Sequence, residues 1–417
     1  MSATRREFLK TSGLVAFGAT VPTFLGRTAL AAEAGKKDTV LVVVQLTGGN
    51  DGLNTVIPFA DAEYAKLRPT LKIPKEQVKK LNDSLGLHPA MEGMAKLYED
   101  GAMAVVQGVG YPNPSQSHFR SMDIWQAASM SESASEGWIG KALKQMPNPA
   151  FHVATKNEPA PLALAGAPVR VPSITSLADF ELKVESVSGS DNRRQKAIIE
   201  GAANMPGEPV RARSASDGNV NLLDFVSRTA VNTYASSKRL QEIGKNYQPK
   251  EPYPQTGLAE RLKLAAQLID GGLGARLFYV SIDGFDTHAG QGGLVGPHPT
   301  LWREVSGAIT AFYKDMAARG HKDRVCVMTF SEFGRRAKEN GSKGTDHGAA
   351  APMFLVGAQV KAGVVGEHPS LTKLEMGNLK HAVDFRQVYA AVLDRWLVVP
   401  SRDVLGGEFK ATEIFKS

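Results

Sequence analysis

The sequence lacks several features that would by themselves assign a protein to a structural class. Its 417 residues include one cysteine, Cys326, so an internal disulfide is excluded. The apolar neighbours of Cys326 favour burial of the thiol as a small hydrophobic group. There is no internal repeat and no low-complexity tract. After the N-terminal segment, no stretch is long and apolar enough to span a bilayer, so we expect no stable membrane insertion.

The excess of positive charge is also small. The formal net charge is +7, and the first 31 residues contribute three of these charges through Arg5, Arg6, Lys10 and Arg27 against Glu7. The rest of the chain is therefore only mildly basic, with both signs mixed. No stripe of basic and aromatic residues is present. We expect no nucleic-acid partner and no binding to anionic membranes.

The N-terminus carries a targeting pattern. Thr4-Arg5-Arg6-Glu7-Phe8-Leu9-Lys10 matches the twin-arginine export motif, and a moderately apolar stretch with small residues near Ala31 follows. A membrane anchor is disfavoured because Gly, Thr and Pro interrupt this stretch. We predict a twin-arginine signal over residues 1–31, with the export machinery and signal peptidase as partners. The mature chain would then be periplasmic or secreted, and this route carries proteins that are already folded.

Apolar strand-like runs alternate with helical patterns through most of residues 32–417. This order predicts one α/β domain with a largely parallel central sheet flanked by helices. The strand candidates are Thr39–Leu46, Met103–Gly108, Leu162–Leu164, Arg276–Ile282, Arg324–Phe330 and Met353–Val356. The helix candidates are Ala90–Glu99, Ser117–Ala128, Leu222–Ile243, Ala259–Ile269, Thr300–Arg319 and Phe385–Leu397. The polar segment 186–254 is predicted to be a helical insertion over the sheet edge; a linker between two domains is the alternative.

Three of the apolar runs end abruptly in acidic residues or histidine. In parallel sheets the ligand crevice lies beyond the carboxyl ends of the strands, so side chains that follow different strands meet there. The candidate metal ligands are Asp51 after the first run, Asp283, Asp286 and His288 after the second, and Glu332, Asp346 and His347 after the third. Carboxylates and imidazoles suit one or two divalent ions, with zinc, magnesium or calcium all open. The alternatives are a helix cap at Asp51 and solvated polar loops at the other positions.

A nucleophile is harder to place. Ser115 and Ser117 lie in a loop after the strand at Met103 and before a helix, where free N–H groups favour an anion and lower the pKa of a hydroxyl. His118 and Arg120 follow and could bind a phosphate or sulfate group. We favour Ser117 as nucleophile and Arg120 as anion-binding residue. The competing interpretation is that Ser115 or Ser117 only caps the helix.

Taken together, these motifs resemble an uncharacterised bacterial family of twin-arginine-exported proteins within the alkaline phosphatase and sulfatase superfamily. The resemblance covers essentially the whole chain. It rests on Gly49-Asn50-Asp51-Gly52-Leu53-Asn54, Ser117-His118-Phe119-Arg120-Ser121-Met122-Asp123, Phe285-Asp286-Thr287-His288, Ser331-Glu332-Phe333-Gly334-Arg335, Asp346-His347 and Asp384-Phe385-Arg386-Gln387-Val388-Tyr389. It implies an α/β sandwich with two metal sites at strand carboxyl ends and a hydroxyl or formylglycine nucleophile between them. By position, Asp51, Asp286, His288 (or Asp283) and His347 would be ligands and Ser117 the nucleophile.

The sequence also departs from the superfamily pattern. His288 lies five residues after Asp283 and two after Asp286, whereas the superfamily commonly spaces these ligands four apart. Glu332-Phe333 stands where Asp-His is usual, and no Cys/Ser-x-Pro-x-Arg motif is present, which argues against a formylglycine. These changes are consistent with one metal ion rather than two, or with a site that has lost catalysis.

We therefore carry two main hypotheses. The first is an exported metal-dependent hydrolase acting on small phosphate or sulfate esters, with Arg120 or Arg335 steadying the transferred group. The second is a non-catalytic periplasmic binding or assembly factor that retains the same fold. A metal-free Ser-His-carboxylate hydrolase is disfavoured because no Gly-x-Ser-x-Gly motif occurs.

Overall fold

The computed structural model describes residues 38–146, 148–177 and 242–416. The predicted export signal at 1–31 lies outside these residues, as does most of the predicted insertion at 186–254. Of that insertion, only 242–254 is described, and residues 242–246 are helical.

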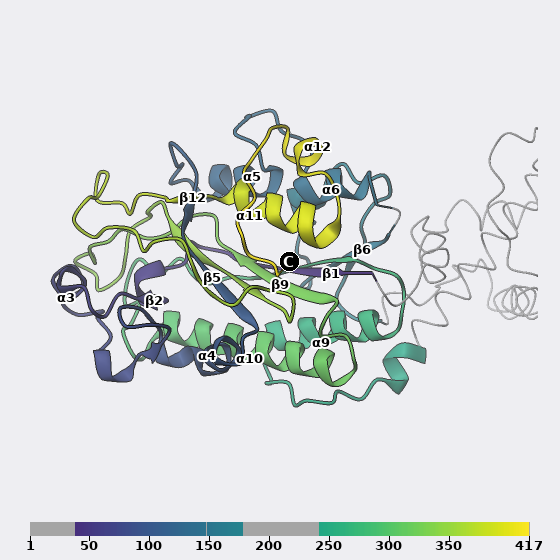
Figure 1. Ribbon diagram of the computed structural model, residues 1–417, viewed down its shortest axis with the longest axis horizontal. Coiled ribbons are helices and arrows are strands. Elements are labelled where there is room, and N and C mark those ends of the chain that lie inside the picture. Colours follow the sequence, from purple (N-terminus) through teal and green to yellow (C-terminus); the bar gives the residue numbers. More distant parts are fainter. Residues whose placement is uncertain (1–37, 147, 178–241, 417) are drawn as a thin grey trace, which may run out of the picture.

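Within the described residues, a nine-stranded sheet forms the centre of the fold (Figure 1). Its strands are β1 (Val40–Leu46), β5 (Met103–Gly110), β6 (Ala150–Val153), β7 (Ser173–Ile174), β8 (Leu277–Ile282), β9 (Val325–Phe330), β10 (Ala351–Val356), β11 (Gly363–Val365) and β12 (Val383–Asp384). They lie in the order β11-β5-β10-β9-β1-β8-β6-β7, with β12 beside β5. Strand β10 runs antiparallel to β5 and β9, and the other neighbouring pairs are parallel. The carboxyl ends of β1, β5, β8 and β9 therefore share one edge.

Helices cover both faces of this sheet. Figure 1 shows α4 (Glu92–Glu99), α9 (Gly257–Asp270) and α10 (Pro297–Ala318) below it, and α5 (His118–Ala127), α6 (Trp138–Leu143), α11 (Phe385–Ala391) and α12 (Ser401–Leu405) above it. Short helical turns are η1 (Gly52–Asn54), η2 (Lys75–Gln77), η3 (Pro89–Met91), η4 (Leu162–Leu164) and the π-helical η6 (Val392–Leu397). The predicted class, an α/β fold with a largely parallel sheet between helices, is confirmed.

Strand β1 shows why the central strands read as continuous apolar runs. Its alternate residues Val40, Val42 and Val44 pack into the core that includes α9 and α10, whereas Leu41 and Val43 pack into the core that includes α5, α6 and α11. Both faces of the strand are thus buried, so neither face tolerates polar residues. Polar side chains appear only where the strand ends.

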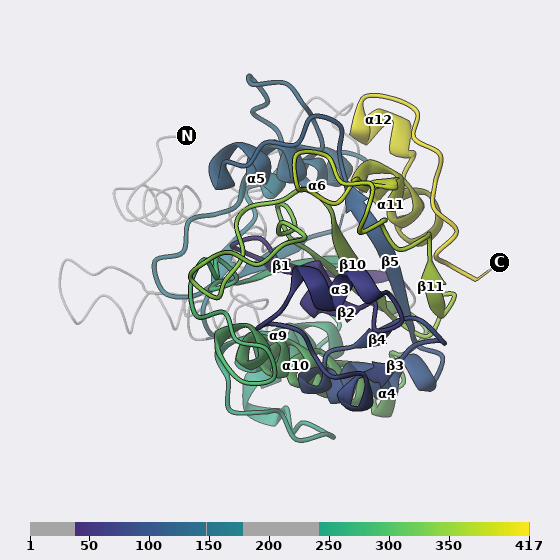
Figure 2. The same cartoon turned by 90° about the vertical axis from the view of Figure 1, so that its left-hand side faces the viewer.

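A smaller three-stranded sheet follows β1 in the chain. It consists of β2 (Val56–Ile57), β4 (Gly86–Leu87) and β3 (Lys79–Lys80), and α3 (Ala62–Leu67) lies between β2 and β3 in sequence. Figure 2 views the molecule from the end where α3 and this sheet lie. Among the described residues, no helix is both long and apolar enough to cross a membrane.

One predicted strand is wrong. Leu162–Leu164 forms the 3-10 turn η4, in which the Ala165 N–H donates to the Leu162 carbonyl at 2.9 Å. Pro159 and Pro161 precede it, and proline disfavours a paired strand because it lacks an N–H group. The other five predicted strands are confirmed within two residues at each end. The predicted helices in the described part of the chain are confirmed within three residues, with η6 completing the predicted helix Phe385–Leu397. The predicted helix Leu222–Ile243 lies almost wholly outside it.

The packing of the sheet predicts the effect of one truncation. Phe278 in β8 is 1% exposed and stacks on Phe151 in β6, with ring centroids 5.7 Å apart. Phe278→Ala should therefore lower the free energy of unfolding by about 3–5 kcal/mol. The matched control is Phe119→Ala, because Phe119 is 88% exposed and its loss should change stability by less than about 0.5 kcal/mol. Urea denaturation measures both, and equal effects would contradict the assigned packing.

Candidate metal centre

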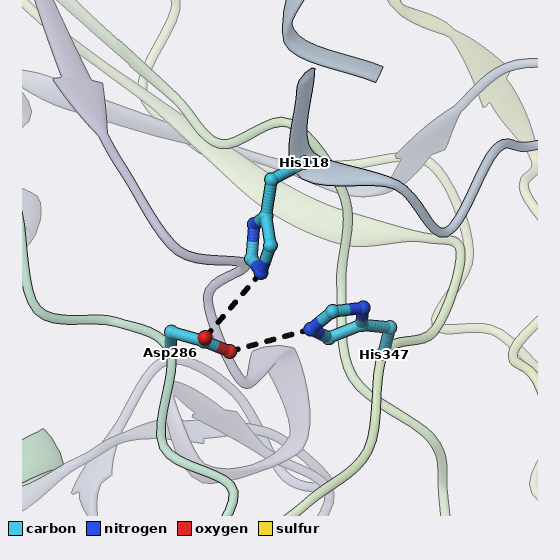
Figure 3. A group of neighbouring side chains, drawn as sticks. All are labelled: His118, Asp286 and His347. Atoms are coloured by element: carbon cyan, nitrogen blue, oxygen red, sulfur yellow. Dashed lines mark hydrogen bonds and ion pairs between the residues drawn. The ribbon is translucent and has the colours of Figure 1, made fainter. Parts of the chain in front are cut away.

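Three side chains from separate segments converge at the carboxyl edge of the sheet. His118 is the first residue of α5, Asp286 follows β8, and His347 lies in the loop after β9. One ligand atom from each lies within 4.8 Å of the others. His118 Nε2 is 3.4 Å from Asp286 Oδ2, and His347 Nε2 is 3.3 Å from Asp286 Oδ1. Figure 3 shows both imidazole rings directed at the carboxylate.

His288 adjoins this group. Its Nε2 is 2.8 Å from His347 Nε2 and 3.1 Å from Asp286 Oδ1. The four side chains His118, Asp286, His288 and His347 are called the cluster below. The side chains of His288 and Asp286 are 45% and 47% exposed, so the cluster is open to solvent on one side. Imidazole nitrogen and carboxylate oxygen together form a donor set typical of zinc and related divalent ions.

One atom of the cluster lacks the partner that a buried polar group normally has. His118 Nε2 is buried and makes no hydrogen bond within the described residues. Because buried polar atoms are nearly always satisfied, an orphaned nitrogen that faces a carboxylate and two other imidazoles fits a metal ligand. The residues present thus suit a divalent ion.

Each imidazole is held from behind by an oxygen of the protein. His118 Nδ1 is 2.8 Å from Glu332 Oε1, and His347 Nδ1 is 2.7 Å from the Gln116 carbonyl oxygen. His288 Nδ1 is 3.6 Å from Asp346 Oδ1. All three rings therefore turn Nε2 toward the cluster.

The surrounding charges shift the pKa values of these groups. A hydrogen bond to Glu332 raises the pKa of His118, whereas burial lowers the pKa of His347. Partial burial alone would raise the pKa of Asp286, but the hydrogen bond and charge of Arg335 outweigh it and lower that pKa. A hydrogen bond from Asn340 lowers the pKa of Asp346. Asp286 and Asp346 are therefore ionised, and His347 neutral, at pH 7.

Arg335 contacts the cluster through Asp286, and all three of its guanidinium nitrogens donate hydrogen bonds. Its side chain is buried, and its Nη2 is 2.7 Å from Asp286 Oδ1. The guanidinium also donates to the carbonyl oxygens of Gly48, Gly49, Phe285 and Thr345. Arg335 thus donates to acceptors of the protein itself.

Asp51 is placed in a buried ion pair outside the cluster. Its oxygens lie 2.5 and 2.8 Å from Nη1 and Nη2 of Arg68, and Gln291 Nε2 donates to Oδ2. Burial alone would raise the pKa of Asp51, but the charge and hydrogen bond of Arg68 overcome this and lower it to about 2. Gln291 Oε1 in turn accepts from the hydroxyls of Thr287 and Thr345. Thr287 lies between Asp286 and His288 in the chain, and Thr345 precedes Asp346. Asp51 therefore supports the loops in this structure and does not face the cluster.

Asp283 is exposed and lies apart from the cluster. It lines a cavity of about 450 Å³ between the ends of β1 and β8, α5 and the loop before η4. The polar lining includes Gln45, Asp123, Glu158 and Tyr279. None of the four cluster residues lines this cavity.

The predicted catalytic residues lie on the first turn of α5. Ser117 is the N-cap residue; its side chain makes no capping hydrogen bond and is exposed. The hydroxyl of Ser115 accepts from the Ser117 N–H at 3.2 Å. Arg120 donates to the carbonyl oxygens of Met130 and Ser131 and makes no contact with the cluster.

The structure thus brings together Asp286, His288 and His347, with Glu332 and Asp346 behind the histidines. It does not bring Asp51 or Asp283 to them. The sequence-based prediction of ligands missed His118, which was read only as an anion-binding residue. Its position at the start of the helix that follows the parallel strand β5 was the signal that could have found it.

The model of one protein family, described as "Protein of unknown function (DUF1501)", matches residues 38–404. The chain belongs to this family. The match includes every residue of the cluster. The prediction of an uncharacterised family is thereby confirmed. No curated protein matches the DUF1501 chain in sequence.

Among solved structures, the chain is similar to the PsFucS1 sulfatase from Pseudoalteromonas sp., with 11% identity over 94% of this chain and 77% of that chain and a TM-score of 0.38. The lipoteichoic acid synthase LtaP from Listeria monocytogenes shares 10% identity over 78% and 67%, with a TM-score of 0.33. An alkaline phosphatase from the Antarctic bacterium TAB5 shares 12% identity over 78% and 93%, with a TM-score of 0.31. At these scores the likeness establishes no activity for this DUF1501 protein.

The Asp51–Arg68 pair predicts a specific pH dependence of stability. At pH 7, Asp51→Asn should lower the free energy of unfolding by about 3–5 kcal/mol, because it leaves the buried Arg68 charge unpaired. The folded pKa of about 2 lies below the unfolded value of 3.8. The contribution is therefore complete above about pH 4 and is lost as the pH falls toward 2.

Denaturant unfolding from pH 7 to pH 2.5 tests this, and the gap between wild type and Asp51→Asn should narrow below pH 4. Asp283→Asn is the control, since Asp283 is exposed. A gap that stays constant with pH would contradict the pairing.

Proposed function

We propose that this protein is an exported metal-dependent hydrolase that acts on small phosphate or sulfate esters. The observation that supports this most directly is the convergence of His118, Asp286 and His347 at the carboxyl edge of the sheet. In α/β folds with parallel strands, this edge is where ligands bind.

The cluster would hold one divalent ion through the Nε2 atoms of its histidines and the carboxylate of Asp286. When bound, such an ion polarises the ester and lowers the pKa of a nearby hydroxyl. Arg335 keeps Asp286 ionised and fixed in place. The buried Arg68–Asp51 pair, through Gln291, holds the loops on which Asp286 and His347 lie.

Ser117 is the proposed nucleophile and Arg120 the proposed anion-binding residue. The Ser117 hydroxyl is exposed, makes no hydrogen bond within the described residues, and precedes the cluster residue His118 in the chain. Arg120 would exchange its two carbonyl partners for the transferred group.

The cellular site of this activity is also a proposal. The twin-arginine motif at Arg5-Arg6 supports export through that pathway and removal of residues 1–31 by signal peptidase. Because the pathway carries folded proteins, the ion could be installed before export.

Elemental analysis of the mature protein, purified without chelator, tests the metal centre. We expect about one divalent ion per chain, and we expect His347→Ala to lose it together with activity on a panel of phosphate and sulfate esters. His381→Ala is the matched control, since His381 lies outside the cluster. A wild-type protein without stoichiometric metal would contradict the proposal.

A non-catalytic binding factor on the same fold is the second candidate. It is favoured by the contacts of Arg120 and Arg335, whose donors bind backbone carbonyls and Asp286 and not an open position at the cluster. The ester panel separates the two functions. Turnover that is lost in Ser117→Ala, with metal content unchanged, supports the hydrolase. Metal-loaded protein that hydrolyses no ester supports the binding factor.

A further inference from the structure

The side chain of Glu332 is fully buried, and both of its oxygens already have partners in the protein. Oε1 lies 2.8 Å from His118 Nδ1 and accepts from the Gly48 N–H, also at 2.8 Å. Oε2 accepts from the Ser331 hydroxyl at 3.1 Å. The carboxylate therefore faces the back of the His118 ring, on the side away from the cluster.

This contact sets the tautomer of His118. With the Nδ1–H donating to this carboxylate, a ring that binds a metal ion does so through the lone pair on Nε2. That atom is buried, has no hydrogen-bond partner in the described residues, and lies 3.4 Å from Asp286 Oδ2. A lone pair and a carboxylate oxygen repel each other at this distance unless a proton or a metal cation lies between them.

The same reasoning applies to the other two imidazoles. His347 Nδ1 faces the Gln116 carbonyl, which can only accept, and His288 Nδ1 faces Asp346. Their Nε2 atoms lie 2.8 Å apart, and two lone pairs at this distance would repel each other unless a proton or a metal cation lies between them. One shared cation relieves the repulsion at all three nitrogens. Histidine ligands of metals are commonly oriented in this way, by an acceptor on the far nitrogen.

We propose that Glu332 is a positioning residue that holds His118 as a third imidazole ligand, and that the resulting site selects zinc or a similar transition-metal ion over magnesium and calcium. The inference rests on the metal centre of the proposed function. Imidazole nitrogen suits zinc, whereas magnesium and calcium prefer oxygen ligands. It departs from the expectation from sequence that Glu332 binds the ion directly.

Calorimetric titration of the metal-free mature protein with zinc, magnesium and calcium tests the selectivity. We expect zinc to bind at one ion per chain and about a hundredfold or more tighter than either of the other two. Magnesium or calcium affinity equal to that of zinc would overturn the inference.

The Glu332→Gln variant tests the positioning role. It should weaken zinc binding by about 10–100-fold without changing the stoichiometry. Asp270→Asn is the matched control, because Asp270 Oδ1 pairs with His321 Nε2 at 3.0 Å and belongs to a carboxylate–histidine pair outside the cluster. Circular dichroism confirms that both variants are folded. Unchanged affinity in Glu332→Gln would overturn the proposal.

A double variant shows whether Glu332 acts through His118. If it does, adding Glu332→Gln to His118→Ala should cost no further zinc affinity, whereas independent effects would add. In the wild type, nitrogen-detected NMR should show the His118 proton on Nδ1 both with and without zinc. Additive losses in the double variant, or the absence of a proton on Nδ1 in the zinc-loaded protein, would contradict the assignment.

These readouts are independent of hydrolysis. Selective, Glu332-dependent zinc binding without turnover of any ester would support this inference while rejecting the proposed hydrolase. Turnover that requires magnesium or calcium, with no effect of Glu332→Gln on binding, would support the hydrolase while rejecting this inference.

Discussion

A single buried guanidinium ties together the loops that carry the cluster. Arg335 donates to the carbonyl oxygens of Gly48, Gly49, Phe285 and Thr345 and to the Asp286 carboxylate. These acceptors belong to the segments after β1, β8 and β9. A buried charge of this kind is tolerated only when its donors are satisfied, so the loops must hold their positions for the arginine to stay there. The backbones of two of these loops also pack closely at Gly48, which has φ +118°. A Cβ atom at this position would lie 2.3 Å from the Asp286 nitrogen, so only glycine fits.

A second buried ion pair, Asp51–Arg68, is connected to the same loops through Gln291. Asp51 and Arg68 neutralise each other, and Gln291 relays this contact to Thr287 and Thr345. Each threonine is next in sequence to a residue of the site. The charged side chains in this region have two different roles. Glu332, Asp51 and the two arginines fix the scaffold, whereas the side chains of the cluster stay partly open to solvent. Arg335 holds the half-exposed Asp286 carboxylate through Nη2 and lowers its pKa.

Much of the fold follows from the sequence, because strands buried on both faces must be apolar throughout and end where polar residues begin. The central strands and long helices could be read from that pattern alone. Short elements could not: β6 and β7 have few residues, and Leu162–Leu164 has strand-like composition but turns after Pro161.

For the site, the sequence indicates the correct edge of the sheet. It does not show which carboxylate meets an arginine, because Arg68 lies 17 residues from Asp51 in a loop without any ligand-like pattern. His118 was missed as a ligand because it is the first residue of α5 and does not directly follow a strand end.

The central claim is that histidines from three segments hold one ion at the carboxyl edge of the sheet. X-ray absorption at the zinc edge, measured on zinc-loaded mature protein, tests this directly. The account predicts a shell of nitrogen and oxygen atoms at about 2.0–2.1 Å with the multiple scattering of three imidazole rings. A shell of oxygen atoms without imidazole scattering would contradict it.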